Sequence, residues 1–534
     1  MRKMTAICLA LVLLLGLLGS ASASDEPAQA SDVTTLTVFI DKPNTVPGWK
    51  WGDDEVSREI TRQTGIRLEV TNATTTDHQE LATLLSSGKF AYDIIVTNMY
   101  GAMPNMLIAQ GFAAPLNQLA DEYCPEFWDV LPTDEDKVLN WDDGNLYYVV
   151  DQFGDVERLD ELKEPFSPQA SFLVNTQALK ELGNPSISNF EELKDVLKQV
   201  KEQYGTAFPL YDGNISNANS EQNLAQVINR LMGGTNVYSI QEDGTVQLNF
   251  QDEAYYKAVK YINSLYREGL INAENFTVTH EQFKQLMSER QVFAYIGHFW
   301  QVLSGYDGGL LADAPYQCVD YPIASDTDPK NVKLLNSYCS VGVENAVFIN
   351  VDSKNQEDAI RYLTYLLSDA GQIVTREGVK DVTYTLDDEG IPHPTQLRLE
   401  YESGPVDKLL RELGMNNQQV QWLPSMWIYS LARHLRIDNE PYYAAFLDTA
   451  RPYSSWERLN ILSGILTDAE LMATYTQIIT LWNNALPSLY LANSDLEFEA
   501  AYEKLIGDAK MLGLEKLEAA YTANYTKYLE RGVQ

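Results

Sequence analysis

The sequence predicts an α/β protein whose C-terminal part is largely helical. Two blocks of the chain, residues 36–116 and 172–300, alternate short apolar runs with amphipathic stretches, and helical patterns dominate from residue 356 onward. Strands that alternate with helices along a chain form parallel sheets with right-handed crossovers. Residues 291–300 are the clearest strand, because seven of these ten residues are apolar or aromatic, which is typical of a strand buried on both faces.

The first block contains three expected strands, at residues 36–40, 66–70 and 92–96. Between the first two, Asp53 to Glu55 suit the positive N-terminus of a helix. Gly65 then supplies the left-handed backbone that commonly ends a helix. Further helices are expected around Leu81–Gly88 and over Pro104–Gln110, and a strand follows over Asn145–Val150.

The second block repeats this rhythm without repeating the sequence. Ser188 and Glu191 have the spacing of a capping box that opens a helix, and Asp243-Gly244 is typical of a hairpin turn. Expected strands are 172–175, 208–211, 237–242, 245–250, 291–300, 316–322 and 339–350, and expected helices include 252–268, 281–290 and 356–368.

The N-terminus has the three parts of a secretory signal peptide. Arg2 and Lys3 precede an apolar run from Ala6 to Leu18, and small residues follow, so cleavage is expected after Ala23. The run is too short for a membrane anchor. Residues 24–32 are expected to form a flexible leader. The protein is therefore expected to be exported, to the periplasm or to the extracellular face of the cell envelope.

The charge of the chain limits its possible binding partners, and its cysteine content limits its possible disulfides. The chain has 39 basic and 75 acidic residues and a net charge of −36, which makes nucleic acid and anionic membranes poor partners. Cys124, Cys318 and Cys339 remain after the signal peptide. An odd number leaves at least one free thiol; Cys318 and Cys339 could form a pair, or all three could be structural thiols.

A series of short motifs runs along nearly the whole chain after the signal peptide: Leu36–Ile40, Thr64–Ile66, Leu84–Gly88, Tyr92–Ile95, Gly111–Leu116, Asp143-Gly144, Phe293–Trp300 and Glu377–Val379 with Tyr384. The order of these motifs resembles the family 1 extracellular solute-binding proteins of bacterial ABC importers, especially the longer, oligosaccharide-binding members. Two residues depart from the family pattern: Tyr92 stands where Pro is usual, and Ser20 replaces the Cys that would carry a lipid anchor.

The resemblance implies a two-lobed, periplasmic-binding-protein-like fold of type II, with hinge crossovers and a helical C-terminal extension. The N-terminal lobe is expected to comprise residues 33–150 and 320–350, and the C-terminal lobe residues 151–319 and 351–534. The implied function is capture of an oligosaccharide by hinge closure and its delivery to the membrane subunits of an ABC permease. The protein is expected to be a monomer without cofactor or metal.

Binding a sugar requires flat aromatic surfaces for its C–H face and polar groups for its hydroxyls. The firmest pair is Trp49 and Trp51, which lie in the polar loop after the first expected strand. A polar loop has little reason to carry two exposed tryptophans unless something that binds there covers them. The other candidates follow expected strands or lie at a crossover or in the helical part: Asn98, Tyr100, Asp151, Asp212, His298, Trp300, Trp422 and Trp427.

Several of these residues have a purely structural alternative. Trp300 and His298 could belong to the core, and Asp151 could hydrogen-bond within the hinge without touching ligand. Trp422 and Trp427 could pack the helical tail.

No catalytic constellation is apparent. Lys284 stands where a zinc-binding His-Glu-x-x-His motif would need its second His, so the protein is expected not to be an enzyme. Asp326 and Asp328 suggest calcium, but Pro329 follows and the glycine of a calcium loop is missing. A secreted glycoside hydrolase is the main alternative, since any two of the many carboxylates could form its catalytic pair. The other alternative is a sugar-binding protein that serves a membrane sensor.

Overall fold

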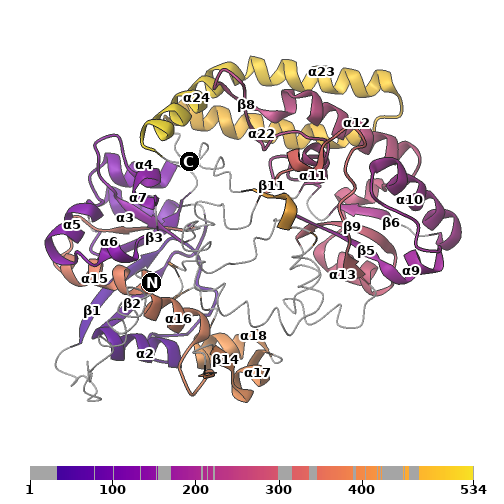
Figure 1. Ribbon diagram of the computed structural model, residues 1–534. Helices are drawn as coiled ribbons and strands as arrows, with labels where there is room; N and C mark the ends of the chain where they lie inside the picture. Colours follow the sequence, from indigo (N-terminus) through magenta and orange to yellow (C-terminus); the bar gives the residue numbers. More distant parts are fainter. Residues whose placement is uncertain are drawn as a thin grey trace, which may run out of the picture.

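The structure is a computed structural model in which two α/β lobes lie side by side and long C-terminal helices pass above them (Figure 1). The expected signal peptide and leader lie outside the described residues. These are 33–151, 153, 170–298, 316–335, 345–423, 449, 451–455 and 468–532, without residues 77, 89, 100, 101, 133, 206, 207, 213, 214, 221, 222, 389–391, 403, 404, 416, 418 and 421.

The first lobe is built on a five-stranded sheet with the order β2-β1-β3-β12-β4. The first three strands are parallel to one another, and β12 is antiparallel to both of its neighbours. β3 and β12 are almost wholly buried, as is typical of inner strands of a sheet that helices cover on both faces. The strands are β1 (Thr34–Ile40), β2 (Ile66–Asn72), β3 (Ile94–Asn98), β4 (Tyr148–Val150) and β12 (Asn345–Ile349).

The first helix of this lobe begins and ends where the sequence indicates. Asp54 caps it by accepting a hydrogen bond from the backbone N–H of Ser57 at 2.7 Å, and Gly65 ends it with φ at 70°, a conformation that costs glycine little. The helices are α2 (Glu55–Thr64), α3 (Gln79–Ser86), α4 (Ala102–Ala109), α5 (Leu116–Tyr123), α6 (Phe127–Val130) and α7 (Glu135–Leu139).

The second lobe is built on a four-stranded sheet with the order β10-β5-β9-β6. β9 lies inside this sheet, parallel to β6 and antiparallel to β5, which explains its continuous apolar sequence. A separate hairpin pairs Tyr238 with Leu248. The strands are β5 (Ala170–Asn175), β6 (Phe208–Asp212), β7 (Tyr238–Ile240), β8 (Val246–Leu248), β9 (Val292–His298) and β10 (Tyr316–Cys318).

The capping box predicted at Ser188 is displaced by one residue. Asn189 caps the helix by accepting from the backbone N–H of Glu192 at 2.9 Å, and Glu192 in turn accepts from the N–H of Ser188 at 2.9 Å. The helices of this lobe are α9 (Thr176–Glu181), α10 (Phe190–Tyr204), α11 (Leu224–Leu231), α12 (Glu253–Arg267) and α13 (His280–Ser288), with 3₁₀ turns η1 (Asn249–Gln251), η2 (Ala273–Phe276) and η4 (Pro329–Asn331).

The expected lobe boundary after residue 350 is wrong. α15 (Gln356–Leu367) packs on α5, α6 and β1, and α16 (Asp369–Glu377) packs on α2, so the chain stays in the first lobe. The elements that follow are β13 (Tyr384–Leu386), β14 (Pro392–Pro394), α17 (Gln396–Glu402), α18 (Val406–Lys408) and the π-helical turn η5 (Leu409–Leu413). The last of these returns to the first lobe, where Arg411 donates to the carbonyl of Pro47 at 2.8 Å.

The expectation that residues 320–335 belong to the first lobe is also wrong. The hydroxyl of Tyr321 donates to the carbonyl of Ala170 at 2.6 Å, and the N–H of Ile323 donates to the carbonyl of Ser188 at 3.1 Å. Both contacts lie in the second lobe. The segment also contains β11 (Leu334–Leu335), which pairs with β15 (Ser454–Ser455) next to the 3₁₀ turn η6 (Arg451–Tyr453). These errors arise because lobe membership depends on packing between distant residues, which local sequence patterns do not encode.

The helical C-terminal extension packs mainly on the second lobe. It consists of α22 (Ala469–Tyr490), α23 (Asp495–Met511) and α24 (Leu514–Glu530). The indole N–H of Trp482 donates to the hydroxyl of Tyr255 at 2.8 Å, and both side chains are fully buried. Among the described residues, no helix has the length and apolarity needed to cross a membrane.

Candidate ligand-binding site

Polar residues gather at one edge of the first sheet. β1 and β3 are parallel, and β12 is antiparallel to both β3 and β4, so the carboxyl ends of β1, β3 and β4 lie at the same edge. Asp41, Asn98 and Asp151 stand at these ends, and Asn345 begins β12 directly opposite Asn98. Ligands of open α/β sheets bind at this kind of edge.

Hydrogen bonds hold this edge together. Asn345 donates from its side chain to Asp151 at 3.0 Å and accepts from the backbone N–H of Asp151 at 3.1 Å. Asp41, only 1% exposed, accepts from the hydroxyl of Thr97 at 2.7 Å and contacts Nδ1 of His78 at 2.6 Å. These bonds form two groups at the edge, one of Asn345 with Asp151 and one of Asp41 with Thr97 and His78.

The second sheet has a corresponding edge. β6 ends at Asp212 and β9 ends at His298, and these strands are parallel. β5, which is antiparallel to β9, begins at Ala170 opposite His298. Asp212 is buried and accepts from the backbone N–H of Leu224 at 3.0 Å. Burial, with a smaller effect from the neighbouring Asp212, raises the pKa of Tyr211 to about 12.

The chain connections show how the two edges are related. The first crossover leaves the first sheet after Asp151 and enters the second sheet at Ala170, and the last crossover into the first sheet arrives at Asn345. Asp151 and Asn345 lie on the polar edge of the first sheet, and Ala170 lies on the polar edge of the second. The polar edges are therefore the ones that the crossovers join, which is the arrangement of two lobes that close on a ligand.

The expectation of two exposed tryptophans in the loop after β1 is wrong. Trp49 is 7% exposed, and its indole N–H donates to the buried carboxylate of Asp54 at 2.6 Å. Trp51 is half-buried, donates to the hydroxyl of Thr61 at 2.8 Å, and lies 6.5 Å from the ring of Tyr362. Trp49 therefore packs under α2 and has no free face for a sugar.

The expectation that Trp422 lines the second lobe is also wrong. It is fully buried in the first lobe, where its ring centroid lies 5.8 Å from that of Tyr362 on α15. Its indole N–H donates to the carbonyl of Gln419 at 2.8 Å. Trp422 is therefore a core residue of the first lobe.

The remaining candidates divide into two groups. Asn98 and Asp151 come together on the first polar edge, and Asp212 lies on the second. Tyr100, Trp300, Trp427 and the side chain of His298 lie outside the described residues and stay predictions. Sequence reasoning missed Asp41, Thr97 and Asn345; Asp41 directly follows the first expected strand, the same signal by which Asn98 was chosen.

The structure also places two of the thiols and the turn that suggested a calcium site. Cys124 and Cys318 are buried free thiols, and Cys339 lies outside the described residues. Asp328 accepts from the backbone N–H of Lys330 at 3.0 Å and so caps a turn. Within the described part of the chain, no three His, Cys, Asp or Glu side chains are grouped so as to hold a metal.

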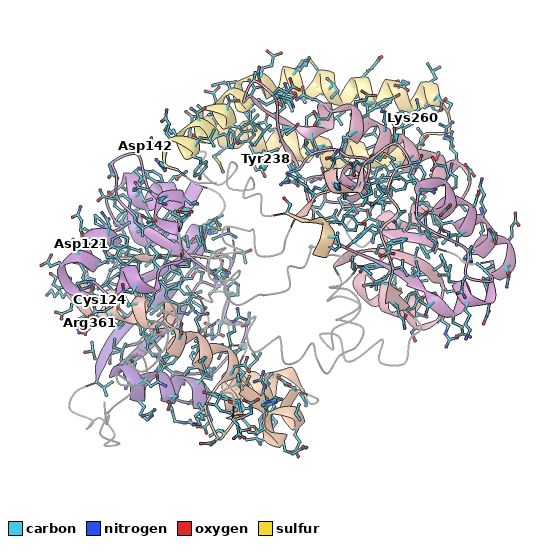
Figure 2. All side chains as sticks on the ribbon, in the orientation of Figure 1. Asp121, Cys124, Asp142, Tyr238, Lys260 and Arg361 are labelled. Atoms are coloured by element: carbon cyan, nitrogen blue, oxygen red, sulfur yellow. The ribbon has the colours of Figure 1, made fainter. Side chains whose placement is uncertain are left out.

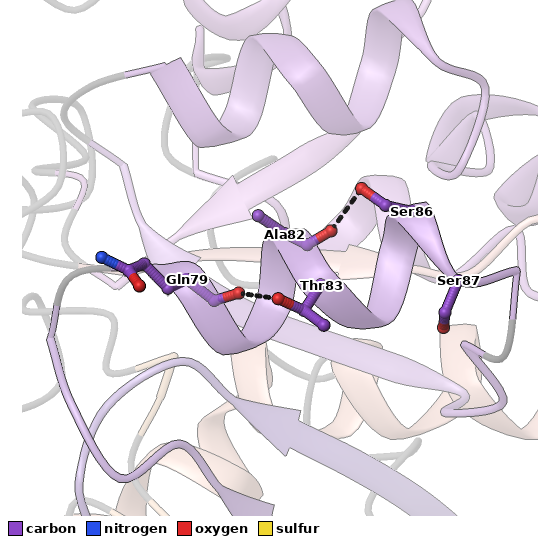
Figure 3. A pocket seen from close by; sticks show the side chains of 5 residues that line it. All are labelled: Gln79, Ala82, Thr83, Ser86 and Ser87. Carbon is purple, nitrogen blue, oxygen red and sulfur yellow. Dashed lines mark hydrogen bonds between the residues drawn. The ribbon is translucent and has the colours of Figure 1, made fainter.

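A pocket of about 540 Å³ lies along α3, and Figure 3 shows the side chains that line it. All of its lining residues come from this helix or its end. All three hydroxyls that line it donate to the helix itself. The hydroxyl of Thr83 donates to the carbonyl of Gln79 and that of Ser86 to the carbonyl of Ala82, each at 2.7 Å, and that of Ser87 donates to the carbonyl of Leu84 at 2.8 Å. Convergent groups from other elements do not line it, and we assign it no ligand.

The sheets, their order and their crossovers define a two-lobed solute-binding protein. The family model described as bacterial extracellular solute-binding protein matches residues 53–373. The chain therefore belongs to this family. A comparison with the curated proteins gives no match.

Solved structures share the fold over nearly the whole chain. An extracellular solute-binding protein from Bifidobacterium longum subsp. infantis has a TM-score of 0.69 at 16% identity, covering 94% of this chain and 99% of its own. An HMO-binding, ABC-transporter-associated solute-binding protein from Bifidobacterium longum infantis has a TM-score of 0.66 at 14% identity, covering 93% and 99%.

A third neighbour is an EF-hand mutant of the Streptococcus pneumoniae ABC-transporter substrate-binding protein FusA in complex with fructo-nystose. It has a TM-score of 0.69 at 16% identity, covering 93% of this chain and 100% of its own. These likenesses confirm the predicted two-lobed α/β fold. The family and these neighbours are binding proteins rather than enzymes.

Proposed function

We propose that this protein is the substrate-binding component of an ABC importer and that it captures an uncharged oligosaccharide between its two lobes. The observation that carries the proposal is the pair of polar sheet edges joined by the crossovers. The sugar ligands of the structural neighbours support the ligand class. The net charge of −36 favours an uncharged sugar over an anionic one.

The proposed mechanism is a shift between open and closed arrangements of the lobes. A ligand favours closure only when it contacts both lobes in the closed form and one lobe in the open form. Asn98 would contact it from the first lobe and Asp212 from the second. Asp151 and Asn345, bonded to each other where the crossovers leave the first sheet, would serve as the hinge. The closed form would then be the one that the permease recognises.

The aromatic surfaces of the proposed site come from the sequence predictions. Trp300 stands two positions after the end of β9 in the sequence and would stack on a sugar ring, and Tyr100 would do so from the first lobe. His298 and Trp427 complete the proposed site. Stacking of a ring on an aromatic side chain contributes on the order of 1–3 kcal/mol, so Trp300→Ala should weaken binding roughly 10-fold or more.

A screen of purified protein against plant, algal and host oligosaccharides tests the proposal. Thermal shift identifies ligands, and tryptophan fluorescence then measures affinity. Asn98→Ala should weaken binding, whereas Asn117→Ala should not, because Asn117 accepts from the N–H of Leu146 near the amino end of β4, away from the polar edge. Chromatography of the sugar after incubation separates binding from hydrolysis: released products would identify a glycoside hydrolase. Binding without any effect on transport by its permease would favour a sensor.

A further inference from the structure

The last helix of the chain contacts both lobes. α24 begins in the second lobe, where it lies along the hairpin strand β8. Its final turn reaches α7 and the turn after it in the first lobe. Figure 1 shows α24 passing from the second lobe toward the first, and Figure 2 shows Asp142 of the first lobe beside its end.

In the second lobe, α24 supplies hydrogen-bond acceptors to the free side of β8. The hydroxyl of Thr522 accepts from the N–H of Val246 at 2.9 Å, and the carboxylate of Glu518 accepts from the N–H of Leu248 at 2.9 Å. Tyr521 is fully buried, and its ring meets that of Tyr238 edge-on at 5.2 Å. These contacts fix the first part of the helix to the second lobe.

In the first lobe, the last turn of α24 caps the end of α7. The hydroxyl of Tyr528 donates to the carbonyl of Val138 at 3.3 Å, and Arg531 donates to the carbonyl of Asn140 at 2.8 Å. The terminal carbonyls of a helix have no partner within the helix, so these donors satisfy them. Lys527 also pairs with Asp142 at 2.9 Å.

Tyr528 is the anchor of this second contact. It is 6% exposed, whereas the ion pair between Lys527 and Asp142 is open to solvent and contributes little by itself. Burial and, to a smaller extent, the nearby Tyr148 of β4 raise the pKa of Tyr528. β4 leads directly into the first crossover, so Tyr528 reaches the part of the first lobe next to the hinge.

Two buried tyrosines of α24 thus pack against different lobes. Tyr521 and Tyr528 are seven residues apart, which is about 10 Å along a helix and places them on one face. A helix this short between two anchors does not stretch. The lobe surfaces that it holds can rotate about it but cannot separate while both anchors are in place.

We propose that α24 is a non-covalent strut beside the hinge, and that its Tyr528 and Arg531 contacts restrict how the lobes move when no ligand is bound. The strut supplements the covalent crossovers. The strut limits the open arrangements of the two lobes, so closure on a ligand loses less conformational entropy. The inference rests on the two-lobed fold and is independent of the ligand class.

Small-angle X-ray scattering of the ligand-free protein tests the strut. Tyr528→Ala should increase the radius of gyration by about 1 Å or more, because the lobes gain orientations that the strut excludes. Arg531→Ala, which removes a cap without emptying a buried site, should give a smaller increase. Leu529→Ala is the matched control, because Leu529 lies on the same turn but is 55% exposed.

Hydrogen exchange of the same variants distinguishes release of the strut from unfolding. In Tyr528→Ala the amides of residues 137–142 and of the last turn of α24 should exchange faster, while those of β1 and β9 stay protected. A radius of gyration equal to that of the wild type, or loss of protection throughout the first lobe, would overturn the proposal. If scattering shows the strut but no oligosaccharide binds, the proposed function fails and this inference stands.

Discussion

The substitution Trp49→Phe tests whether the tryptophans after β1 stabilise the first lobe or bind sugar. The change removes the indole N–H, which donates to Asp54 at 2.6 Å, and keeps an aromatic ring in the site. Asp54 is fully buried, and desolvation raises its pKa despite hydrogen bonds from Ser57 and Trp49. The variant therefore leaves a buried carboxylate with one donor fewer.

The expected loss of stability follows from this contact. A hydrogen bond to a charged group contributes about 1.5–3 kcal/mol, and replacing indole by a smaller ring adds about 0.5–1.5 kcal/mol for the space left behind. We expect the free energy of unfolding of the first lobe to fall by about 2–4 kcal/mol. Trp51→Phe is the matched control: its indole donates to the neutral hydroxyl of Thr61, so the loss should be about 0.5–1.5 kcal/mol.

Urea unfolding followed by circular dichroism measures both variants, at neutral pH and near pH 4. The difference between Trp49→Phe and the wild type should shrink at low pH. Because burial raises the pKa of Asp54, the folded protein takes up a proton on this carboxyl at a higher pH than the unfolded chain does. A protonated Asp54 depends less on the indole donor. An unfolding midpoint equal to that of the wild type, together with a tenfold loss of sugar affinity, would refute the structural role and return Trp49 to the binding site.

Two further predictions concern ion pairs. Glu268 contacts Lys194 at 2.7 Å and Lys198 at 2.6 Å, and these hydrogen bonds lower its pKa. Glu268→Gln should therefore reduce the melting temperature at neutral pH. The reduction should vanish as the pH falls through the lowered pKa, because the glutamate is then protonated in both the folded and the unfolded state. A difference that persists at acid pH would contradict this cause. Arg398 is 2% exposed and bonds to Glu377. Arg398→Met should lower the free energy of unfolding by about 3–5 kcal/mol, because an unpaired carboxylate would remain buried. A neutral effect in chemical denaturation would contradict this.

The sequence was sufficient for the elements whose cause is local. The alternation of Ile66, Leu68 and Val70 with polar residues, and the apolar run of β9, identify strands because burial acts directly on those side chains. Asp54 and Gly65 marked the two ends of α2, since capping depends on residues within a few positions of the helix end.

Local patterns failed where the cause was distant in the chain. Trp51 is covered in part by Tyr362, and Trp422 packs against the same tyrosine. Nothing near position 50 indicates that a helix from residue 356 onward returns to this lobe. The exposure of the tryptophans was misjudged for the same reason as the lobe boundary after residue 350.

The polar edge of the first sheet was predicted only in part. Asn98 and Asp151 were found because each follows an expected strand. Asn345 begins its strand instead of following one, and its contact with Asp151 depends on β12 pairing antiparallel with β4. Antiparallel insertion of a late strand is a long-range event that hydrophobic patterns near residue 345 do not specify.

The central claim is that two lobes close on an oligosaccharide without breaking it. Small-angle scattering with and without a saturating oligosaccharide, chosen by thermal shift, measures this most directly. We predict a radius of gyration smaller by about 1 Å with ligand and an oligosaccharide recovered intact. Binding with no change in the radius of gyration, or recovery of shorter sugars, would contradict the account.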